Sequence, residues 1–261
     1  MNSALPPPLD IRLMNVTATA LLGVFLVMLL GAAAWWALRH PLFAISGITV
    51  QGDVVHNNAL TLRANVAPRL AGNFFTTNLA AARQAFEGVP WVRTAIVRRE
   101  FPNRLRVQLQ EHQAVAFWGT DSESRLLNSF GEVFEANAGD LEQEALPRLT
   151  GPEQQSHQVL AMYRAVKPLF EPLELTLERL ALTAGGNWQA ELETGAVIEL
   201  GRGTPDEVTA RTQRFLRTLT QVAWRYGRRP DALVSADLRY GDGYALRLRG
   251  VGTTGAETPK K

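Results

Sequence analysis

The sequence contains no cysteine among its 261 residues. Disulfide bonds, thiolate nucleophiles and cysteine-ligated zinc sites are therefore excluded. Histidine is scarce as well: the four histidines are scattered along the chain, and none has the spacing of an HExxH metal site. A chain without cysteine fits an oxidising bacterial periplasm and other compartments equally well, so this absence does not fix its location.

The sequence also lacks the common phosphate-binding and catalytic motifs. The Gly-Arg-Gly-Thr segment at residues 201–204 precedes a predicted helix, but it does not match the P-loop pattern, and Pro205 removes one amide donor. We interpret it as a turn between a strand and a helix. Glu111 and His112 could be a catalytic pair, but they end an amphipathic strand, where we expect a surface position. We therefore expect no enzymatic activity, no metal and no cofactor.

No stretch of the chain concentrates charge of one sign. There are 27 Lys and Arg against 25 Asp and Glu, which gives a formal net charge of +2. Three of the basic residues are lysines, and the arginine-rich stretches are interleaved with acidic and apolar residues. A nucleic-acid interface needs basic residues gathered on one face without offsetting acids, so we do not expect nucleic-acid binding.

Charged residues are missing altogether between Arg12 and Arg39. Residues 16–38 form a continuous apolar run, and about 20 helical residues cross a hydrocarbon core about 30 Å thick. Trp35 and Trp36 lie where an interfacial aromatic belt is expected. We predict a transmembrane helix over residues 16–38 after a short tail. Two alternatives are a cleaved signal peptide, whose apolar region is usually shorter, and a buried core helix.

The orientation of this helix does not follow from charge. Asp10 opposes Arg12 before the apolar run, and Arg39 and His40 follow it, so the positive charges on the two sides are nearly balanced. Large domains are also translocated largely regardless of charge.

Residues 43–112 have the pattern of a small α+β module. Residues 43–52 and 91–99 read as strands, and residues 104–110 alternate apolar and polar side chains, as in a sheet with one packed face. Between them lie two predicted helices, the second over residues 79–86 with Asn78 as its cap. The first, capped by Asn57 or Asn58, has the expected buried stripe Leu60, Leu62, Val66 and Leu70.

The second half of the chain predicts a larger mixed β-sheet domain with flanking helices, so the fold class is α+β. The expected strands cover residues 114–118, 180–182, 188–192, 197–200, 232–237 and 244–249, with a hairpin around residues 129–131. The expected helices cover residues 155–170 and 204–226, the latter with the buried stripe Val208, Phe215, Leu219 and Val222. The last residues, 251–261, are expected to be disordered.

Several stretches of the chain resemble a known family. Pro-Trp-Val-Arg-Thr-Ala-Ile-Val-Arg-Arg-Glu-Phe-Pro-Asn-Arg-Leu at residues 90–105, continued by Val107, Leu109 and residues 111–116, resembles a POTRA domain of the FtsQ/DivIB family of bitopic bacterial division proteins. The family usually has Glu-x-x-Pro-x-Ala where this chain has Glu-His-Gln-Ala-Val-Ala, a departure in a connector. The hairpin around Gly131 and the segments at residues 200–203 and 234–240 also look like FtsQ.

The resemblance implies an architecture and a role. It implies a cytoplasmic tail (1–15), a transmembrane helix (16–38), a POTRA domain (43–112), an FtsQ-type β domain (113–250) and a disordered tail (251–261). Such a protein would lie in the inner membrane at the division septum, with its C-terminal domain in the periplasm. It would be a non-catalytic scaffold that binds FtsB and FtsL and links early division proteins to the septal peptidoglycan machinery, without a small-molecule substrate.

The last predicted strand offers a mechanism for partner binding. An edge strand exposes unpaired amides and carbonyls, to which a partner can add a strand. By resemblance, Arg239, Tyr240 and Leu248 fall where the family contacts FtsB, and Arg202 lies beside that surface, where it could pair with a partner carboxylate. The predicted partner-binding residues are Arg202, Arg239, Tyr240, Gly243, Tyr244, Leu246 and Leu248. We expect Leu248→Glu to weaken partner capture and to leave the domain folded.

Other interpretations remain open at this point. Tyr240 could pack on its own domain, and Arg202 could form an internal ion pair. The polar face of the POTRA strand, with Arg104, Arg106, Gln108 and Gln110, could be a second binding surface or simply a solvated face. The chain could instead be a POTRA-containing accessory protein of polypeptide export, but it lacks the series of alternating strands of about 10 residues that a β-barrel needs. A periplasmic enzyme would need converging acids in a deep pocket.

Overall fold

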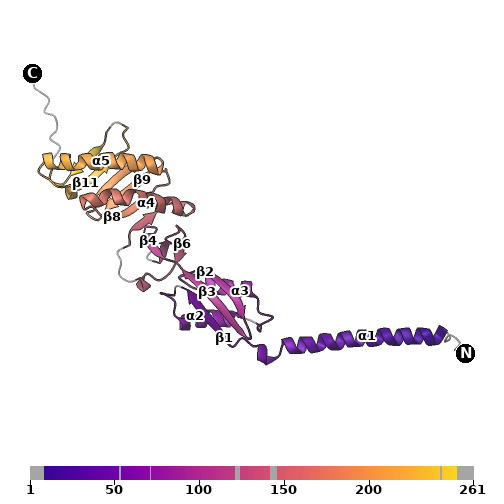
Figure 1. The fold of residues 1–261 in the computed structure, drawn as a ribbon. Helices are drawn as coiled ribbons and strands as arrows, with labels where there is room; N and C mark the ends of the chain where they lie inside the picture. The colour runs from indigo at the N-terminus through magenta and orange to yellow at the C-terminus, as the bar shows by residue number, and fades with distance from the viewer. Residues whose placement is uncertain are drawn as a thin grey trace, which may run out of the picture. The chain divides into compact units, whose positions relative to one another are not determined.

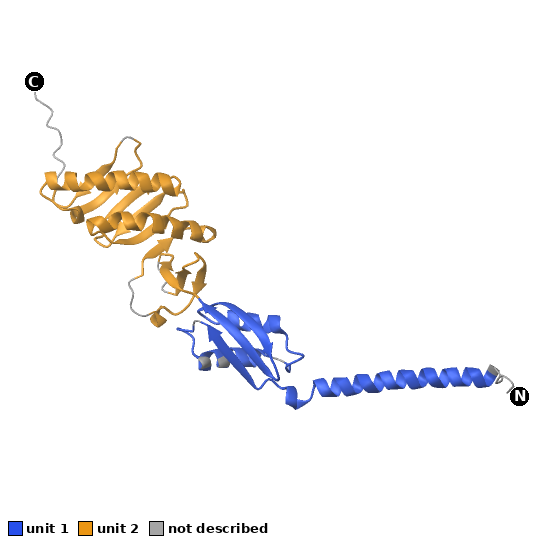
Figure 2. Cartoon of the chain, in the orientation of Figure 1, with its two compact units in different colours: residues 1–111 blue, residues 112–261 orange. Residues whose placement is uncertain are grey.

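The computed structural model describes residues 9–52, 54–70, 72–120, 124–141, 146–241 and 243–251. The chain divides into two compact units, residues 1–111 and residues 112–261, each with its own sheet (Figure 2). Of the predicted disordered tail, residues 252–261 lie outside the described residues, as do the first eight residues of the predicted cytoplasmic tail.

A long apolar helix opens the first unit. The helix α1 (Leu9–Leu38) has 30 residues, and it begins at Leu9, earlier than the predicted boundary at residue 16. At about 1.5 Å per residue it is about 45 Å long, more than a hydrocarbon core of about 30 Å requires. In the described part of the chain it is the one helix that is long and apolar enough to cross a membrane. It fits a single membrane span.

A three-stranded sheet forms the body of the first unit. The strands are β1 (Gly47–Gly52), β2 (Val92–Glu100) and β3 (Arg104–Glu111), in the order β1-β3-β2. The central strand β3 is parallel to β1 and antiparallel to β2. Two α-helices, α2 (Ala59–Val66) and α3 (Leu79–Glu87), and two short 3₁₀ helices, η1 (Pro41–Phe43) and η2 (Ala67–Arg69), complete the unit. The predicted order strand–helix–helix–strand–strand is confirmed.

The alternation along β3 builds the core of this unit. Leu105, Val107 and Leu109 are buried, and Val107 and Leu109 belong to the same core cluster as Leu62 and Val66 of α2. The predicted stripe on α2 is wrong at its first member, because Leu60 is 77% exposed. Residues two positions apart lie on nearly opposite sides of a helix, whereas positions i and i+4 share a face.

Glu111, at the end of β3, does not have the surface position that its sequence context suggests. Its side chain is 5% exposed, and its carboxylate accepts hydrogen bonds from the backbone N–H groups of Val55, His56 and Asn57 at 2.9–3.0 Å. Burial raises the pKa of Glu111, but hydrogen bonds from the backbone of His56, the Asn57 side chain and the backbone of Val55 outweigh it, so the pKa is below its ordinary value. The carboxylate therefore fastens the segment between β1 and α2 to the end of the sheet.

The second unit contains a nine-stranded mixed sheet in the order β12-β11-β10-β9-β8-β7-β4-β5-β6. Its strands are β4 (Ala114–Trp118), β5 (Arg125–Asn128), β6 (Val133–Glu135), β7 (Arg148–Thr150), β8 (Leu177–Leu182), β9 (Trp188–Leu192), β10 (Val197–Gly201), β11 (Leu233–Asp237) and β12 (Ala245–Leu248). The short strand β7 is parallel to both of its neighbours, β4 and β8. The α+β class predicted from the sequence is confirmed.

Two helices lie over the sheet of the second unit, α4 (Ser156–Phe170) and α5 (Pro205–Arg225) (Figure 1). The unit also contains short 3₁₀ helices at η3 (Ala138–Asp140), η4 (Glu153–Gln155), η5 (Glu171–Leu173) and η6 (Pro230–Ala232). The helix α5 begins with a capping box between Thr204 and Glu207. Val208, Phe215 and Leu219 are buried as predicted. Val222, the last member of the predicted stripe, is only half-buried, and the fully buried residue near the end of α5 is Ala223.

Candidate partner-binding site

The strand β12 is one edge of the nine-stranded sheet. It pairs antiparallel with β11, and no described strand lies on its other side. The other edge of the same sheet is β6. The terminal strand is therefore neither enclosed between two strands nor part of the interior of the sheet.

The side chains of β12 alternate between the core and the solvent. Leu248 is 4% exposed and belongs to the core, and Leu246 packs against that core, whereas Ala245 and Arg247 are exposed. The expectation that Leu248→Glu leaves the domain folded is therefore contradicted, because this change would bury an unpaired carboxylate.

The backbone N–H and C=O groups of successive β12 residues point alternately toward β11 and away from it, in the plane of the sheet. The N–H of Arg249 donates to the carbonyl of Ala232 at 2.8 Å, on the β11 side. In an antiparallel ladder alternate residues direct their backbone groups to opposite sides, so Arg247 points toward β11 like Arg249, and Leu246 points its N–H and C=O away from it. The residues that insert side chains into the core are thus the residues that present backbone groups at the edge.

Tyr244, just before β12, is engaged with α5. Its ring packs edge-on against Phe215 at a centroid distance of 5.0 Å, and its hydroxyl and that of Thr218 are 2.5 Å apart. Gly243, which precedes it, is exposed. Tyr244 therefore holds the start of β12 against the helix.

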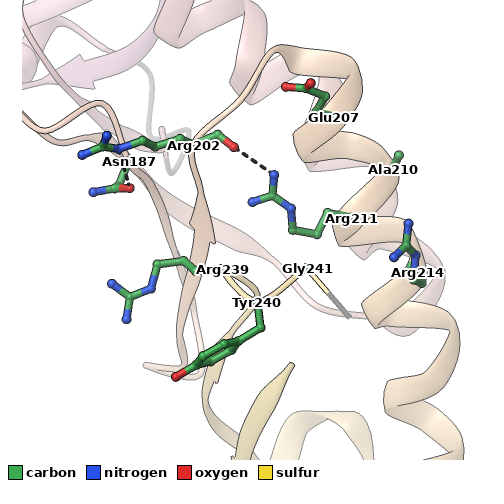
Figure 3. Close-up of a pocket in the computed structure, with 9 residues that line it drawn as sticks. All are labelled: Asn187, Arg202, Glu207, Ala210, Arg211, Arg214, Arg239, Tyr240 and Gly241. Carbon is green, nitrogen blue, oxygen red and sulfur yellow. Dashed lines mark hydrogen bonds between the residues drawn. The ribbon is translucent and has the colours of Figure 1, made fainter. Parts of the chain in front are cut away.

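A pocket of about 560 Å³ lies at the ends of β10 and β11 and the first turns of α5 (Figure 3). Its lining is rich in arginine: Asn187, Arg202, Glu207, Ala210, Arg211, Arg214, Arg239, Tyr240 and Gly241. The structure thus brings together three of the predicted residues, Arg202, Arg239 and Tyr240. It places Gly243, Tyr244, Leu246 and Leu248 in or just before the following strand.

Arg211 and Arg214 were not predicted as site residues. They lie three residues apart on one face of α5, and this spacing within an arginine-rich helix is the signal that marks them. Their meeting with Arg202 and Arg239 depends on how the helix lies on the sheet, which periodicity does not show.

Hydrogen bonds to the backbone hold Arg211 in place. Its guanidinium donates to the carbonyls of Leu200 and Arg202, the latter at 2.8 Å (Figure 3). Gly201 between them has φ +81°, and a Cβ there would lie 2.4 Å from Nη1 of Arg211. A glycine is therefore required both for the left-handed backbone and for the close approach of the arginine.

Arg202 is exposed, and its Nε donates to Oδ1 of Asn187 at 3.3 Å. Within the described part of the chain neither Arg202 nor Arg214 forms an ion pair with an acidic side chain. The internal ion pair considered for Arg202 is thus replaced by a contact with a neutral amide. Its positive charge remains available to an anion in the pocket.

Arg239 and Tyr240 lie side by side after β11 (Figure 3). The guanidinium of Arg239 donates two hydrogen bonds to the carboxylate of Asp237, at 2.9 and 2.6 Å. These hydrogen bonds hold the pKa of Asp237 below its usual value and raise that of Arg239. Tyr240 is 62% exposed, so most of its side chain is not packed on its own domain.

This arrangement favours the binding of an anion. Among the residues that the structure describes, four arginines and one glutamate line the pocket, and that glutamate already accepts from the backbone N–H of Thr204 at 2.9 Å. Among the described residues no group of three histidine, aspartate or glutamate side chains is placed to hold a metal ion. Chemically, the site offers charge and hydrogen-bond donors beside the loop that leads into an open edge strand.

Comparisons with known proteins cover almost the whole chain. Residues 43–112 match the FtsQ-type POTRA domain, and residues 116–239 match the C-terminal region of cell division protein FtsQ/DivIB. The chain is 40% identical to cell division protein FtsQ of Thiomonas arsenitoxydans over 95% of this chain and 91% of that protein. It is also 40% identical to that of Burkholderia pseudomallei (93% and 94%) and 36% identical to that of Bordetella pertussis (92% of each chain).

Proposed function

Because the chain belongs to the FtsQ/DivIB family of cell division proteins, we propose that it is a non-catalytic inner-membrane scaffold of the bacterial division machinery. In this proposal it binds FtsB-like and FtsL-like single-span proteins and links early division proteins to the septal peptidoglycan machinery. One observation carries the proposal: the loop that leads into the edge strand β12 also lines a pocket that contains four arginines.

Strand addition at β12 is the proposed mode of binding. The outward N–H and C=O of Leu246 pair with a strand of the partner and extend the nine-stranded sheet. Leu248 and Tyr244 contribute indirectly, because their side chains hold β12 against the core and α5. Specificity comes from the exposed side chains that flank the edge, Arg247 on β12 and Tyr240 before it.

The arginine pocket supplies the charged part of the proposed interface. A partner carboxylate would meet Arg202 and Arg214, whose charges are not neutralised by acidic side chains within the described part of the chain. Arg239 can turn to a partner only at the expense of its pair with Asp237, so we assign it a smaller share of the binding energy. Charge-assisted hydrogen bonds of this kind are about twice as strong as neutral ones.

The proposed location follows from α1 and the family. The helix anchors the protein in the inner membrane, with the N-terminus in the cytoplasm and both folded units in the periplasm at the division septum. Confinement to the membrane raises the effective concentration of other membrane-bound partners, so contacts of modest affinity are sufficient for assembly.

Site-specific photo-crosslinking in dividing cells tests the proposal. A photoreactive residue at Arg247 of β12 is expected to crosslink to the FtsB-like protein, whereas the same residue at Glu135 of β6, the opposite edge, is not. A fluorescent fusion is expected to form a ring at mid-cell. A uniform envelope signal together with no crosslink from Arg247 would contradict the proposal.

Two variants at one position separate backbone pairing from side-chain contact. Leu246→Pro removes the outward N–H and is expected to abolish co-purification with the FtsB-like partner, because proline cannot donate to an added strand. Leu246→Ala removes the side chain but retains the N–H, and it is expected to preserve binding. Equal binding by both variants would rule out strand addition at this edge.

A further inference from the structure

A group of exposed apolar side chains lies at the end of the first unit's sheet where the chain arrives from α1. Leu42, Phe75 and Phe101 are 73%, 43% and 79% exposed. They belong to three separate segments: η1, the loop before α3 and the turn between β2 and β3. Together with the half-buried Phe43 they are named here the entry patch.

The strand register brings the first and third segments together. Gly47, the first residue of β1, is paired with Arg104, the first residue of β3, so the β2–β3 turn lies beside the start of β1. Ser46 secures this arrangement, because its N–H and hydroxyl donate to the carbonyl and side chain of Asn103 at 2.9 and 2.8 Å.

Aromatic contacts join the loop before α3 to both of the other segments. The rings of Phe43 and Phe75 meet edge to face at a centroid distance of 4.9 Å, and the buried Phe74 lies 6.4 Å from Phe101. The N–H of Phe74 donates to the carbonyl of Phe43 at 2.8 Å. These contacts hold the three segments of the patch together at one end of the unit.

An exposed arginine of β2 holds this loop in shape. Arg99 of β2 donates to the carbonyls of Phe74 and Thr77 at 2.6 and 2.8 Å. The side chain of Asn73 accepts from the N–H groups of Phe75 and Thr76, both at 3.0 Å. Phe75, which is 43% exposed, is therefore presented in part to solvent on a preformed loop.

The distance of the patch from the membrane is limited by the chain itself. Leu42 is four residues after Leu38, the end of α1, and four extended residues span at most about 14 Å. Trp35 and Trp36 near the end of α1 are the residue type that lies at the membrane–water interface. The guanidinium of Arg39 lies 4.3 Å from the ring centroid of Trp35, so the first charge after the apolar run is at the same level.

We propose that the entry patch inserts into the lipid leaflet from which α1 emerges, at the boundary between headgroups and acyl chains. Apolar side chains fixed this close to the end of a span are buried most readily by lipid. Exposed Arg39 and Arg104 flank the patch and favour anionic headgroups, while the neighbouring Glu100 is paired with Arg106. The proposal requires only that α1 crosses a bilayer, and it is independent of strand addition at β12.

The absence of cysteine allows a direct test on the full chain. Phe101→Cys and Ile96→Cys each create a single site for an environment-sensitive fluorophore. Ile96 is a matched control because it is 50% exposed on β2, the strand that leads to Phe101, and the five extended residues from Ile96 to Phe101 span about 17 Å. The labelled proteins are reconstituted into vesicles of phosphatidylethanolamine and phosphatidylglycerol, and circular dichroism checks that both are folded.

At Phe101→Cys we expect quenching by lipids with a spin label near the headgroup to be about twofold stronger than at Ile96→Cys, and quenching by aqueous iodide to be about twofold weaker. Equal quenching at the two sites overturns the proposal. Protection of the Phe101→Cys label that rises with protein concentration and persists in detergent also overturns it, because a second copy of the chain then covers the patch. A loss of the β12 crosslinks described above leaves this result unaffected.

Discussion

The two edges of the nine-stranded sheet end the same sheet in different ways. The edge strand β6 has three residues and none of them is buried, and its Phe134 stacks on His112 at a centroid distance of 4.1 Å. The edge strand β12 has four residues, inserts Leu248 into the core and follows a loop whose residues Arg239, Tyr240 and Gly241 line the arginine pocket. Similar length and similar open backbone therefore do not make the edges equivalent. What distinguishes β12 is its anchored backbone and the charge beside it.

The largest expected difference between the edges is in stability. Leu248→Ala is expected to lower the free energy of unfolding of the second unit by about 3 kcal/mol, because a fully buried leucine is lost. Val133→Ala on β6 is expected to cost about 1 kcal/mol, because Val133 is only half-buried. Hydrogen exchange of peptides from β9 and β10, measured on the full chain in detergent, reports both values. Equal losses would show that the two edges are equally anchored.

The next effect is on partner binding. Arg202→Ala is expected to weaken binding of the FtsB-like partner about tenfold, through the loss of a charge-assisted hydrogen bond. Arg217→Ala is the matched control, since Arg217 is an exposed arginine of α5 that does not line the pocket. Affinity measured with the reconstituted full-length proteins should fall for Arg202→Ala alone. A similar fall for both variants would assign the effect to overall charge.

Ionic strength is expected to have a smaller effect. An increase in salt from about 0.1 to 0.5 M should weaken partner binding about threefold, because exposed charges are screened over shorter distances. The double variant Arg202→Ala and Arg214→Ala should lose most of this salt dependence. If the double variant responds to salt as the unchanged protein does, the pocket is not the source of the electrostatic attraction.

The smallest effect concerns the ion pair at the end of β11. Because hydrogen bonds from Arg239 lower the pKa of Asp237 in the folded state, this pair stabilises the fold at pH values above the ordinary aspartate pKa. The contribution disappears as the pH falls through the lowered pKa. A carboxyl titration by nuclear magnetic resonance should show the depressed pKa, and Arg239→Gln should return it toward the ordinary value. An unchanged titration in Arg239→Gln would show that another group lowers this pKa.

Much of the local structure was predictable from the sequence. Alternation along residues 104–110 predicted the buried face of β3, and the Asn78 and Thr204 caps marked the starts of α3 and α5. The resemblance to the FtsQ/DivIB family is confirmed by matches to both folded units. These features depend on neighbouring residues, where periodicity and capping are strong signals.

Long-range packing was not predictable in the same way. The buried position of Glu111 depends on backbone amides more than fifty residues earlier in the chain. The insertion of β7 between β4 and β8 and the meeting of Arg211 with Arg202 depend on pairings that no local pattern specifies. The roles of the seven predicted partner-binding residues stay predictions, although the burial of Leu248 and the packing of Tyr244 now restrict what their side chains can contact.

The narrow strand β7 has a mechanical consequence. It joins the hairpin side of the sheet to the β12 side, yet only two residue pairs connect it to β4, Phe117 with Arg148 and Trp118 with Leu149. A pulling force that a moving partner exerts on β12 reaches the hairpin strands β5 and β6 along the sheet, through the two residue pairs between β7 and β4. We expect the first rupture under load at the β4–β7 junction, and single-molecule stretching from β12 would locate it there or elsewhere.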